Sequence, residues 1–296
     1  MVRIADLFAA YEAEDRRVVS FEFFPPKTDE AVEELFRVAR DELAPLAPSF
    51  ISVTYGAGGS TRRKTLELVS RIKNDIGLEA MAHLTCVGHS RDELAEIIDG
   101  IVAAGIENVL ALRGDPPTGE TEFRPAPDGF RYGSELIAFI RDLGAPLCLA
   151  AACYPEKHPE AATAEQDLAN LKAKVDAGAD YLVTQLFFNN ADFFAFQERA
   201  RAIGIAVPIV PGIMPITNYK QVRRFTRMCG THIPVKLTDR LKAAKNDRAA
   251  VTSIGISYAI DQCRELLAND VPGLHFYTLN KSSATRAILS RLRHAR

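Results

Sequence analysis

Polar side chains that could take part in acid–base chemistry stand at the ends of short apolar runs in this chain of 296 residues. Glu22 closes the run 18–22 and is flanked by Phe21 on one side and by Phe23 and Phe24 on the other. An acid enclosed by phenylalanine should have its charged form desolvated and its pKa raised, which suits a general acid near neutral pH. The alternative is a carboxylate that pairs with an arginine or lysine across the rim that the strand ends form.

A second carboxylate, Asp115, follows Arg113 and Gly114 after another apolar run. Gly114 would let the backbone approach a ligand closely, and the carboxylate could hold a developing positive charge or accept a hydrogen bond from a heterocycle. An ordinary turn aspartate before Pro116 and Pro117 explains the same residues equally well.

Two histidines are weaker candidates. His83 lies inside an apolar run, where a buried core histidine is the favoured interpretation, and His158 lies in a loop, where a ligand contact and a solvated side chain are equally good interpretations. The six histidines never show HxH or HExxH spacing, and no carboxylate cluster accompanies them. The sequence therefore predicts no metal site.

One predicted helix carries Asp167, Asn170 and Lys174 at positions i, i+3 and i+7, which places them on one face. A solvated polar face is the plain explanation. However, this face follows directly after the loop that holds Tyr154 and His158, which favours a ligand contact.

These residues must be positioned by an alternating pattern of strands and helices. Apolar, β-branched runs predict strands at 18–22, 50–54, 80–84, 108–112, 146–151, 181–185, 207–210 and 274–279. Segments with 3.6-residue periodicity predict helices near 29–43, 62–76, 90–104, 133–143, 162–177, 190–203, 217–229, 249–268 and 282–293. The strands are apolar at nearly every position, so both faces are expected to be buried, as in a parallel sheet.

Eight strands with intervening helices predict a (β/α)8 TIM barrel that forms a single domain over residues 1–296. The main alternative, an open doubly wound sheet, would need a phosphate-binding glycine turn after its first strand. That position holds Phe23-Phe24-Pro25-Pro26 instead, and the glycine-rich stretch 56–61 follows the second strand and lacks the third glycine. In a barrel the carboxyl ends of the strands share one rim, so the polar candidates should converge there.

Composition excludes several other classes of protein. The net charge of −2 leaves no basic field for a nucleic acid, so no nucleic-acid partner is expected. No apolar run approaches the length that spans a membrane, and the charged first 17 residues are unlike a signal peptide. The five cysteines never show CxxC spacing, so neither a disulfide framework nor a zinc site is expected and a cytoplasmic location is predicted.

At these same residues the sequence resembles the methylenetetrahydrofolate reductases, which are flavin-dependent folate enzymes. The resemblance extends from Ser20 to Asn280 in nine blocks: SFEFFPPKT, SVTYGAGGS, AHLTC, ALRGDPP, AACYPEKHPEA, DLANLKAKVDAGAD, TQLFF, PGIMPITNYKQ and FYTLN. It implies a barrel that binds FAD at its strand ends and reduces 5,10-methylenetetrahydrofolate to 5-methyltetrahydrofolate with NAD(P)H, feeding methionine synthesis. Hydride would pass from the nicotinamide to FAD and then to the folate, with both substrates using one site in ping-pong fashion.

The resemblance also implies roles for individual residues. Glu22 would donate a proton as the five-membered ring of the folate opens, and Asp115 would stabilise the cationic iminium form beside the flavin. The residues implied to hold FAD are Thr54, Tyr55, Ala57, His83, Arg113, Gly114, Asp115, Tyr132, Tyr154, His158, Asp167, Asn170 and Lys174. The residues implied to contact the substrate are Gln185, Gln221, Phe225 and Lys281.

Two positions depart from the family pattern. Ala173 stands where some members carry an arginine beside the FAD phosphates, and Lys281 stands where an arginine contacts the folate. A lysine keeps the charge but loses the bidentate fork. The chain ends near the barrel, so the bacterial type without the eukaryotic regulatory extension is expected, as is a homo-oligomer.

Other functions remain open at this stage. A folate- or corrinoid-linked methyltransferase barrel would use similar strand ends without a flavin. A barrel that serves only as a scaffold would have empty or apolar strand ends. The choice between NADH and NADPH is open as well.

Overall fold

The structure is a computed structural model that describes residues 2–56, 62–116, 119 and 122–293, with Arg62 and Arg63 described by their backbone only. The described residues form nine parallel strands in the order β7-β6-β5-β4-β3-β2-β1-β9-β8. Their bounds are β1 Val18–Phe23, β2 Phe50–Val53, β3 Ala80–Thr85, β4 Asn108–Leu112, β5 Cys148–Cys153, β6 Tyr181–Thr184, β7 Ile209–Val210, β8 Gly212–Ile213 and β9 Gly273–Tyr277.

The two strands at the ends of this order, β7 and β8, are one segment of chain interrupted at Pro211. The first half pairs with β6 through Leu182 and Ile209, and the second half pairs with β9 through Gly212 and His275. Proline cannot donate to a strand ladder, but its carbonyl accepts from the His275 N–H at 3.0 Å. This shared segment joins the two edges of the sheet, and the predicted (β/α)8 TIM barrel is confirmed.

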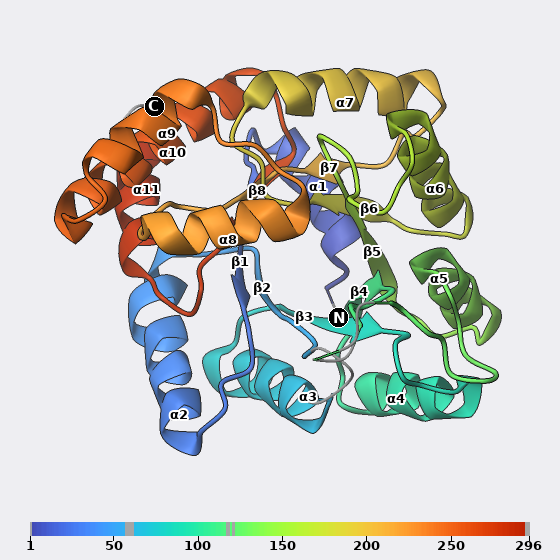
Figure 1. Cartoon of the computed structure of the whole chain (residues 1–296). Coiled ribbons are helices and arrows are strands. Elements are labelled where there is room, and N and C mark those ends of the chain that lie inside the picture. The colour runs from blue at the N-terminus through green and yellow to red at the C-terminus, as the bar shows by residue number, and fades with distance from the viewer. Residues whose placement is uncertain (1, 57–61, 117–118, 120–121, 294–296) are drawn as a thin grey trace.

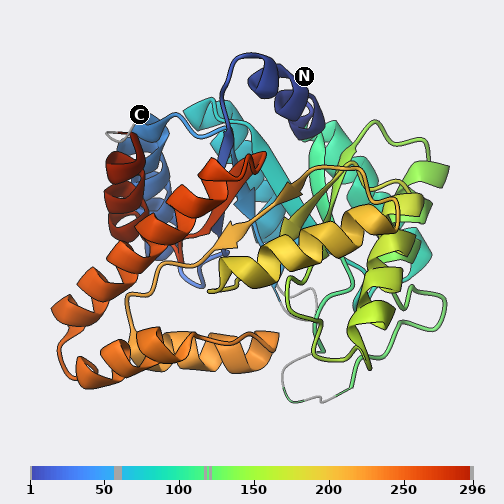
Figure 2. The same ribbon diagram turned by 90° about the horizontal axis from the view of Figure 1, so that it is seen from above.

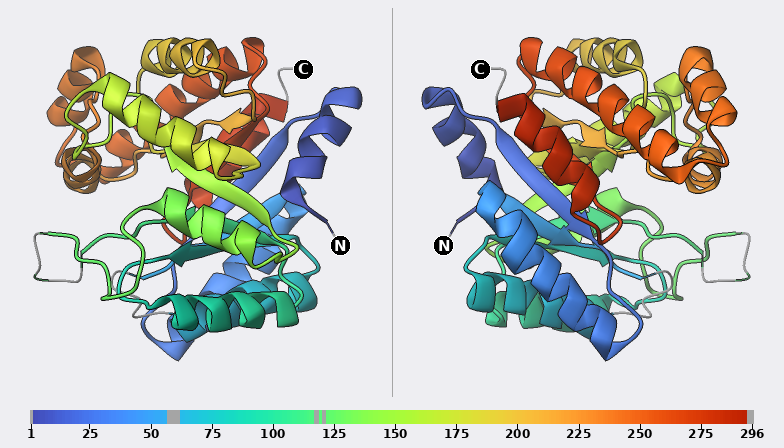
Figure 3. Two further views of the ribbon diagram at one scale, coloured as in Figure 1. Left: turned by 90° about the vertical axis from the view of Figure 1, so that its right-hand side faces the viewer. Right: turned by 90° about the vertical axis from the view of Figure 1, so that its left-hand side faces the viewer.

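Helices surround the strands (Figure 1; Figure 3). Their bounds are α1 Ile4–Ala13, α2 Asp29–Arg37, α3 Arg62–Arg71, α4 Arg91–Ala103, α5 Gly133–Asp142, α6 Ala164–Asp176, α7 Asn190–Ala202, α8 Tyr219–Cys229, α9 Val235–Ala243, α10 Arg248–Ala268 and α11 Ser283–Arg293. The predicted helices 29–43 and 62–76 each end in a π-helical turn, Val38–Leu43 after α2 and Ile72–Ile76 after α3. Across the described part of the chain, no helix combines the length and the apolar character that crossing a membrane requires.

Helix α1 was not predicted, and it lies across one end of the barrel (Figure 2). Its first backbone N–H, from Ile4, donates to the Asn108 side chain at the start of β4 over 2.8 Å. The Phe8 ring lies 5.2 Å from the ring of Tyr181, at the start of β6. Helix α1 therefore covers the amino ends of the strands and leaves the carboxyl ends as the open end.

The barrel interior changes character along its axis. Near α1 it is apolar, where Phe8 packs with Phe50, Met81, Leu110 and Tyr181. A second, larger apolar layer lies between the outer faces of the strands and the helices. Toward the carboxyl ends, the buried side chains of Ser20, Ser52, His83 and His275 make the interior more polar, which positions the candidate site.

Candidate active site

The first group of site residues surrounds Glu22, near the carboxyl end of β1. The Glu22 Oε2 atom lies 3.3 Å from His275 Nε2 on β9 and 3.5 Å from His83 Nε2 on β3. On its other side, the His275 ring meets Ser20 Oγ through Nδ1 at 2.8 Å. Glu22 is 17% exposed while His83 is 5% and His275 0% exposed, so a carboxylate with a small opening to solvent rests on two buried imidazoles.

The electrostatics of Glu22 correct the expectation drawn from its phenylalanine neighbours. Burial alone raises the pKa of Glu22, but the hydrogen bond with His275 and positive charge on the two histidines lower it below its ordinary value. Burial lowers the pKa of His83 to about 4, so His83 is neutral near pH 7, and the hydrogen bond with His275 is the main cause that lowers the pKa of Glu22. The predicted rise of the Glu22 pKa is wrong for the protein without a ligand. The partners are histidines, not the arginine or lysine of the alternative.

Tyr277 extends the rim from β9 toward β6. Its hydroxyl donates to the Thr184 carbonyl over 2.6 Å, and the Tyr277 ring passes close to Gly212. A Cβ added to Gly212 would lie 2.4 Å from that carbonyl and 2.7 Å from the Tyr277 ring. Burial, with the charge of Glu22 next, raises the pKa of Tyr277 well above its ordinary value.

A second group of site residues lies at the ends of β4 and β5 and at the start of α6. Arg113 forms a bidentate ion pair with Glu160 at 2.5 and 2.8 Å, which raises the pKa of Arg113 and lowers that of Glu160. The Tyr154 and His158 rings meet edge to face with centroids 4.6 Å apart.

Helix α6 supplies the rest of this second group. The Asp167 carboxylate accepts from the His158 N–H at 3.0 Å, and the Lys174 ammonium donates to the Ala152 carbonyl at 2.8 Å. Burial lowers the pKa of Lys174 and of His158, against the opposing charge of Asp167. The predicted helix face is therefore held against the β5 end. Asn170, one turn before Lys174, is exposed and accepts from Gln166.

Asp115 lies at the same end of the barrel and is exposed. Burial raises the pKa of Tyr154, and the charge of Asp115 adds to that rise. Tyr154 in turn contributes to the raised pKa of Tyr277, whose largest causes are burial and Glu22. Asp115 and Glu22 thus each raise the pKa of one buried tyrosine at this end, Asp115 that of Tyr154 and Glu22 that of Tyr277.

Position 114 requires a glycine for two reasons. Its φ is +88°, and a Cβ would lie 2.6 Å from Val87 Cγ1 and 2.9 Å from Thr85 Cβ. Gly114 is therefore packed closely against residues at and just after the end of β3, and its predicted close approach to a ligand stays a prediction.

The remaining predicted cofactor residues lie around the same rim. The Thr54 carbonyl accepts from Thr65, and the Tyr55 hydroxyl lies 3.1 Å from His89 Nε2. Tyr132, at the start of α5, is 54% exposed. Ala57 lies outside the described residues.

The predicted substrate residues are spread over three elements. Gln185 follows β6, and its Oε1 accepts from the next backbone N–H. Gln221 and Phe225 lie one turn apart on α8, the first exposed and the second half-buried. Lys281 follows β9 and is exposed.

Sequence reasoning missed His275, Ser20, Tyr277 and the local role of Asn280. The Asn280 side chain clamps Phe24, accepting from its N–H at 2.9 Å and donating to its carbonyl at 2.8 Å, so the loop after β1 is tied to the end of β9. His275 and Tyr277 alternate in β9 with Leu274 and Phe276, and this period of two was the available signal.

Three buried side-chain atoms near this end have no hydrogen-bond partner among the described residues: Ser52 Oγ, His83 Nε2 and Thr85 Oγ1. Buried polar groups are normally satisfied, so such atoms mark places where a ligand or water can bind. His83 is therefore not the satisfied core histidine that was favoured. No group of metal-ligating side chains occurs in the part of the chain that the structure describes.

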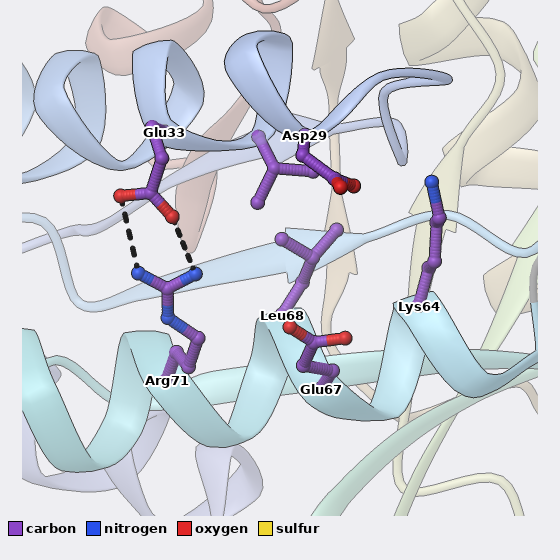
Figure 4. A pocket seen from close by; sticks show the side chains of 7 residues that line it. Asp29, Glu33, Lys64, Glu67, Leu68 and Arg71 are labelled. Carbon is purple, nitrogen blue, oxygen red and sulfur yellow. Dashed lines mark hydrogen bonds and ion pairs between the residues drawn. The ribbon is translucent and has the colours of Figure 1, made fainter.

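A pocket of about 130 Å³ lies elsewhere, between α2 and α3 (Figure 4). Its lining includes the ion pair between Glu33 and Arg71 at 2.9 Å together with Asp29, Lys64 and Glu67. None of the predicted site residues lines it, so it has no part in the site.

The family model and the similar proteins that match this chain all indicate the same family. Residues 7–293 match the family model described as methylenetetrahydrofolate reductase. The chain is 42% identical to methylenetetrahydrofolate reductase (NADH) 1 of Arabidopsis thaliana, across 98% of this chain and 51% of that protein. It is 40% identical to the 5,10-methylenetetrahydrofolate reductase of Escherichia coli, across 91% of this chain and 88% of that protein. The chain thus spans about half the length of the plant relative and most of the bacterial one.

Solved structures with the same fold are more distant. An uncharacterised Clostridium thermocellum protein, which binds two copies of 5-methyl-5,6,7,8-tetrahydrofolic acid, has a TM-score of 0.61 at 16% identity, with 98% of this chain and 100% of that chain covered. A dihydropteroate synthase of Xanthomonas albilineans has a TM-score of 0.51 at 14% identity, with 95% and 92% covered. At these identities the likeness concerns the fold alone.

Proposed function

Because the chain belongs to the methylenetetrahydrofolate reductase family, we propose that it reduces 5,10-methylenetetrahydrofolate to 5-methyltetrahydrofolate, with FAD as hydride carrier and NAD(P)H as donor in a ping-pong reaction. The observation that carries the proposal is the family match over nearly the whole chain, together with Glu22 resting on His275 at the open end of the barrel. The Clostridium thermocellum protein of the same fold supports a folate ligand in this architecture.

The described residues fit a flavin dinucleotide. At the β4–β5 end, the Arg113 guanidinium, which is paired with Glu160, and the Lys174 ammonium, which donates to the Ala152 carbonyl, would bind the phosphates. Gly114, which follows β4 beside Arg113, would contact the cofactor through its backbone. His83 Nε2 is buried without a hydrogen-bond partner among the described residues, so it is available to a polar atom of the cofactor. We assign FAD to these residues, to Thr54, Tyr55, Tyr132, Tyr154, His158, Asp167 and Asn170, and to Ala57. When bound, FAD supplies a two-electron carrier that accepts and returns hydride.

Glu22 is the proton donor in this proposal. Its carboxyl group is held through Oε2 by His275 and is 17% exposed, and because Glu22 lies near the carboxyl end of β1 we infer that the exposed part faces the open end. A ligand that covers this opening removes water from Glu22, which raises its pKa from the lowered value of the free protein and favours the protonated acid.

The other residues around the opening would bind and orient the folate. Asp115 supplies a carboxylate that stabilises the positive charge of the iminium form, and Gln185 and Gln221 supply amide donors and acceptors. Phe225 offers a half-buried aromatic face, and Lys281 offers a cation to the folate carboxylates.

The test follows each half-reaction separately. Purified protein incubated with FAD should show a flavin absorption band, bleach when NADH or NADPH is added under anaerobic conditions, and recover the band when methylenetetrahydrofolate follows. The plant relative is named for NADH, so we expect NADH to bleach the band faster than NADPH. Protein that binds no flavin but transfers a methyl group from methyltetrahydrofolate would overturn the proposal in favour of a methyltransferase barrel.

We also propose that the protein works in the cytoplasm and as a homo-oligomer. All five cysteines carry free thiols, which suits a reducing compartment. Sedimentation of the purified protein measures the oligomeric state.

A further inference from the structure

Among the described residues, the His275 side chain contacts both Glu22 and a further buried polar side chain. The register of β1 and β9 places Ser20 beside His275, and the His275 ring then bridges Ser20 Oγ at 2.8 Å and Glu22 Oε2 at 3.3 Å. His275 has no exposed surface, so neither ring nitrogen reaches solvent. A buried imidazole with both nitrogens occupied has a fixed orientation, and the partner on one side determines the proton on the other.

We propose that His275, held by Ser20, is the positioning residue that directs the proton of Glu22 to the substrate. This inference rests on the proposed reduction of methylenetetrahydrofolate and adds the two residues that prepare its acid.

The chemistry requires one arrangement of hydrogen atoms. The Ser20 hydroxyl donates to Nδ1 of His275, and Nε2–H of His275 donates to Oε2 of Glu22. The acidic proton then resides on Oε1. When the carbon–nitrogen bond of the folate ring breaks, its electron pair stays on the nitrogen, which takes the proton from Oε1 and leaves a carboxylate. The bond from His275 becomes charge-assisted at that moment, so it stabilises the product of the transfer.

The neighbouring groups do not offer the same support. His83 on β3 approaches Glu22 Oε2 at 3.5 Å, but its Nε2 makes no hydrogen bond among the described residues. Tyr277 on β9 directs its hydroxyl to the Thr184 carbonyl. Ser52 on β2 lies opposite Glu22 in the register, but its hydroxyl also makes no hydrogen bond in the described part of the chain. His83, His275 and Tyr277 are therefore the titratable groups that face Glu22, and His275 alone is bonded to it.

The direct test replaces His275 by leucine. Reduction of the bound flavin by NADH should stay within about twofold of the wild type, because that half-reaction needs no proton from Glu22. Reduction of the folate should fall by about 100-fold, which is the lower end of the range for general acid catalysis. The hydrogen bond from His275 favours the carboxylate form, so its loss raises the pKa of Glu22. The alkaline limb of the pH–rate profile for folate reduction, where the rate falls as Glu22 loses its proton, should therefore shift to higher pH by about one unit.

Three further variants separate positioning from a structural role. His275→Gln keeps an amide donor and should recover part of the rate and of the pH shift. Ser20→Ala removes only the hydrogen bond to Nδ1 of His275. It should shift the alkaline limb of the pH–rate profile to higher pH by a smaller amount. Tyr181→Phe is the control, because it removes an equally buried hydroxyl from the amino end of the barrel, away from the site, and should leave the profile unchanged.

A second measurement is independent of turnover. In protein labelled with carboxyl-¹³C glutamate, the Glu22 signal is identified by its loss in Glu22→Gln, and its titration should shift to higher pH in His275→Leu. If the titration and the alkaline limb stay where they are in folded His275→Leu, the inference is overturned. If His275→Leu does not fold, Ser20→Ala decides by the same criteria. A wild-type protein that does not reduce the folate would instead overturn the proposed function.

Discussion

At the scale of single residues, Glu22 is the group whose removal should separate the two halves of the reaction. We expect Glu22→Gln to keep flavin reduction by the nicotinamide within about twofold, because the variant conserves size and hydrogen bonding. Folate reduction should fall by about 100-fold or more, since no other acid lies against His275 and His83 in the described residues. Stopped-flow absorbance of the flavin measures both steps. Equal losses in the two steps would contradict the assignment.

His83 gives a prediction for the pH dependence of stability. Its pKa of about 4 lies below the ordinary value of 6.5, so between these values the unfolded chain binds more protons than the folded protein. The contribution of His83 is therefore complete above pH 6.5 and is lost as the pH falls toward 4, by roughly 3 kcal/mol at most. Urea unfolding of the wild type and of His83→Gln at pH 7 and pH 5 measures the difference. If the wild type loses no more stability than His83→Gln between pH 7 and pH 5, the prediction for His83 is wrong.

What the sequence could predict at this scale was the place of each residue, not its environment. Glu22, Arg113 and Tyr154 were predicted at one rim because strand ends converge in a barrel, and Lys174 was predicted on a helix face that follows the Tyr154 loop. The pKa of Glu22 was predicted in the wrong direction because the argument used Phe21, Phe23 and Phe24, its neighbours along the chain. The deciding partner, His275, lies 253 residues away and reaches Glu22 only through the pairing of β1 with β9.

At the scale of elements, periodicity found the strands and the helices that pack on them but not α1 and α9. Both of these helices are short, 10 and 9 residues. Both lie outside the alternation of strand and helix, α1 before β1 and α9 between α8 and α10, so the alternating pattern did not indicate them. Pro211 similarly divides the predicted strand 207–210 from β8, because a residue without an N–H interrupts the ladder.

Two helical glycines should respond in opposite ways to the same substitution. A Cβ on Gly255 in α10 would lie 1.9 Å from the backbone oxygen of Ile216, so Gly255→Ala should force the helix away from that loop and cost about 3 kcal/mol. A Cβ on Gly100 in α4 would meet nothing closer than Leu66 Cδ2 at 3.8 Å. Gly100→Ala should therefore stabilise the protein by up to about 1 kcal/mol. Urea unfolding decides, and equal effects at the two sites would refute the packing argument.

Helix α1 should contribute to stability without taking part in the chemistry. Phe8→Ala removes a buried ring from Tyr181 and should lower the free energy of unfolding by about 3 kcal/mol. Both half-reactions should keep their rates, because α1 covers the end of the barrel opposite the site (Figure 2). Glu12→Ala, on the exposed side of the same helix, is the control and should change stability by less than about 0.5 kcal/mol. A large loss of activity in folded Phe8→Ala would place α1 nearer to the chemistry than the fold does.

At the scale of the whole molecule, the barrel has one closed and one open end. Residues of α1 and of the amino ends of the strands form an apolar layer that contains none of the proposed catalytic residues. Glu22, His83 and His275 occupy the other end. Unpartnered atoms such as His83 Nε2 lie at this open end, where the bonds left unmade in the free protein are available to a ligand. Binding there should therefore stabilise the folded chain as a whole.

This linkage can be measured without turnover. FAD at 100 times its dissociation constant should stabilise the protein by about 2.7 kcal/mol, and the unfolding temperature should keep rising with FAD concentration. Lys174→Met should bind FAD more weakly and shift less at each concentration, because the cation at the β5 end is lost. Lys245→Met, which removes an exposed lysine from the turn after α9, is the control and should shift like the wild type. If FAD leaves the unfolding temperature unchanged at every concentration, the rim does not bind the dinucleotide, and the assignment of its cations to phosphates is wrong.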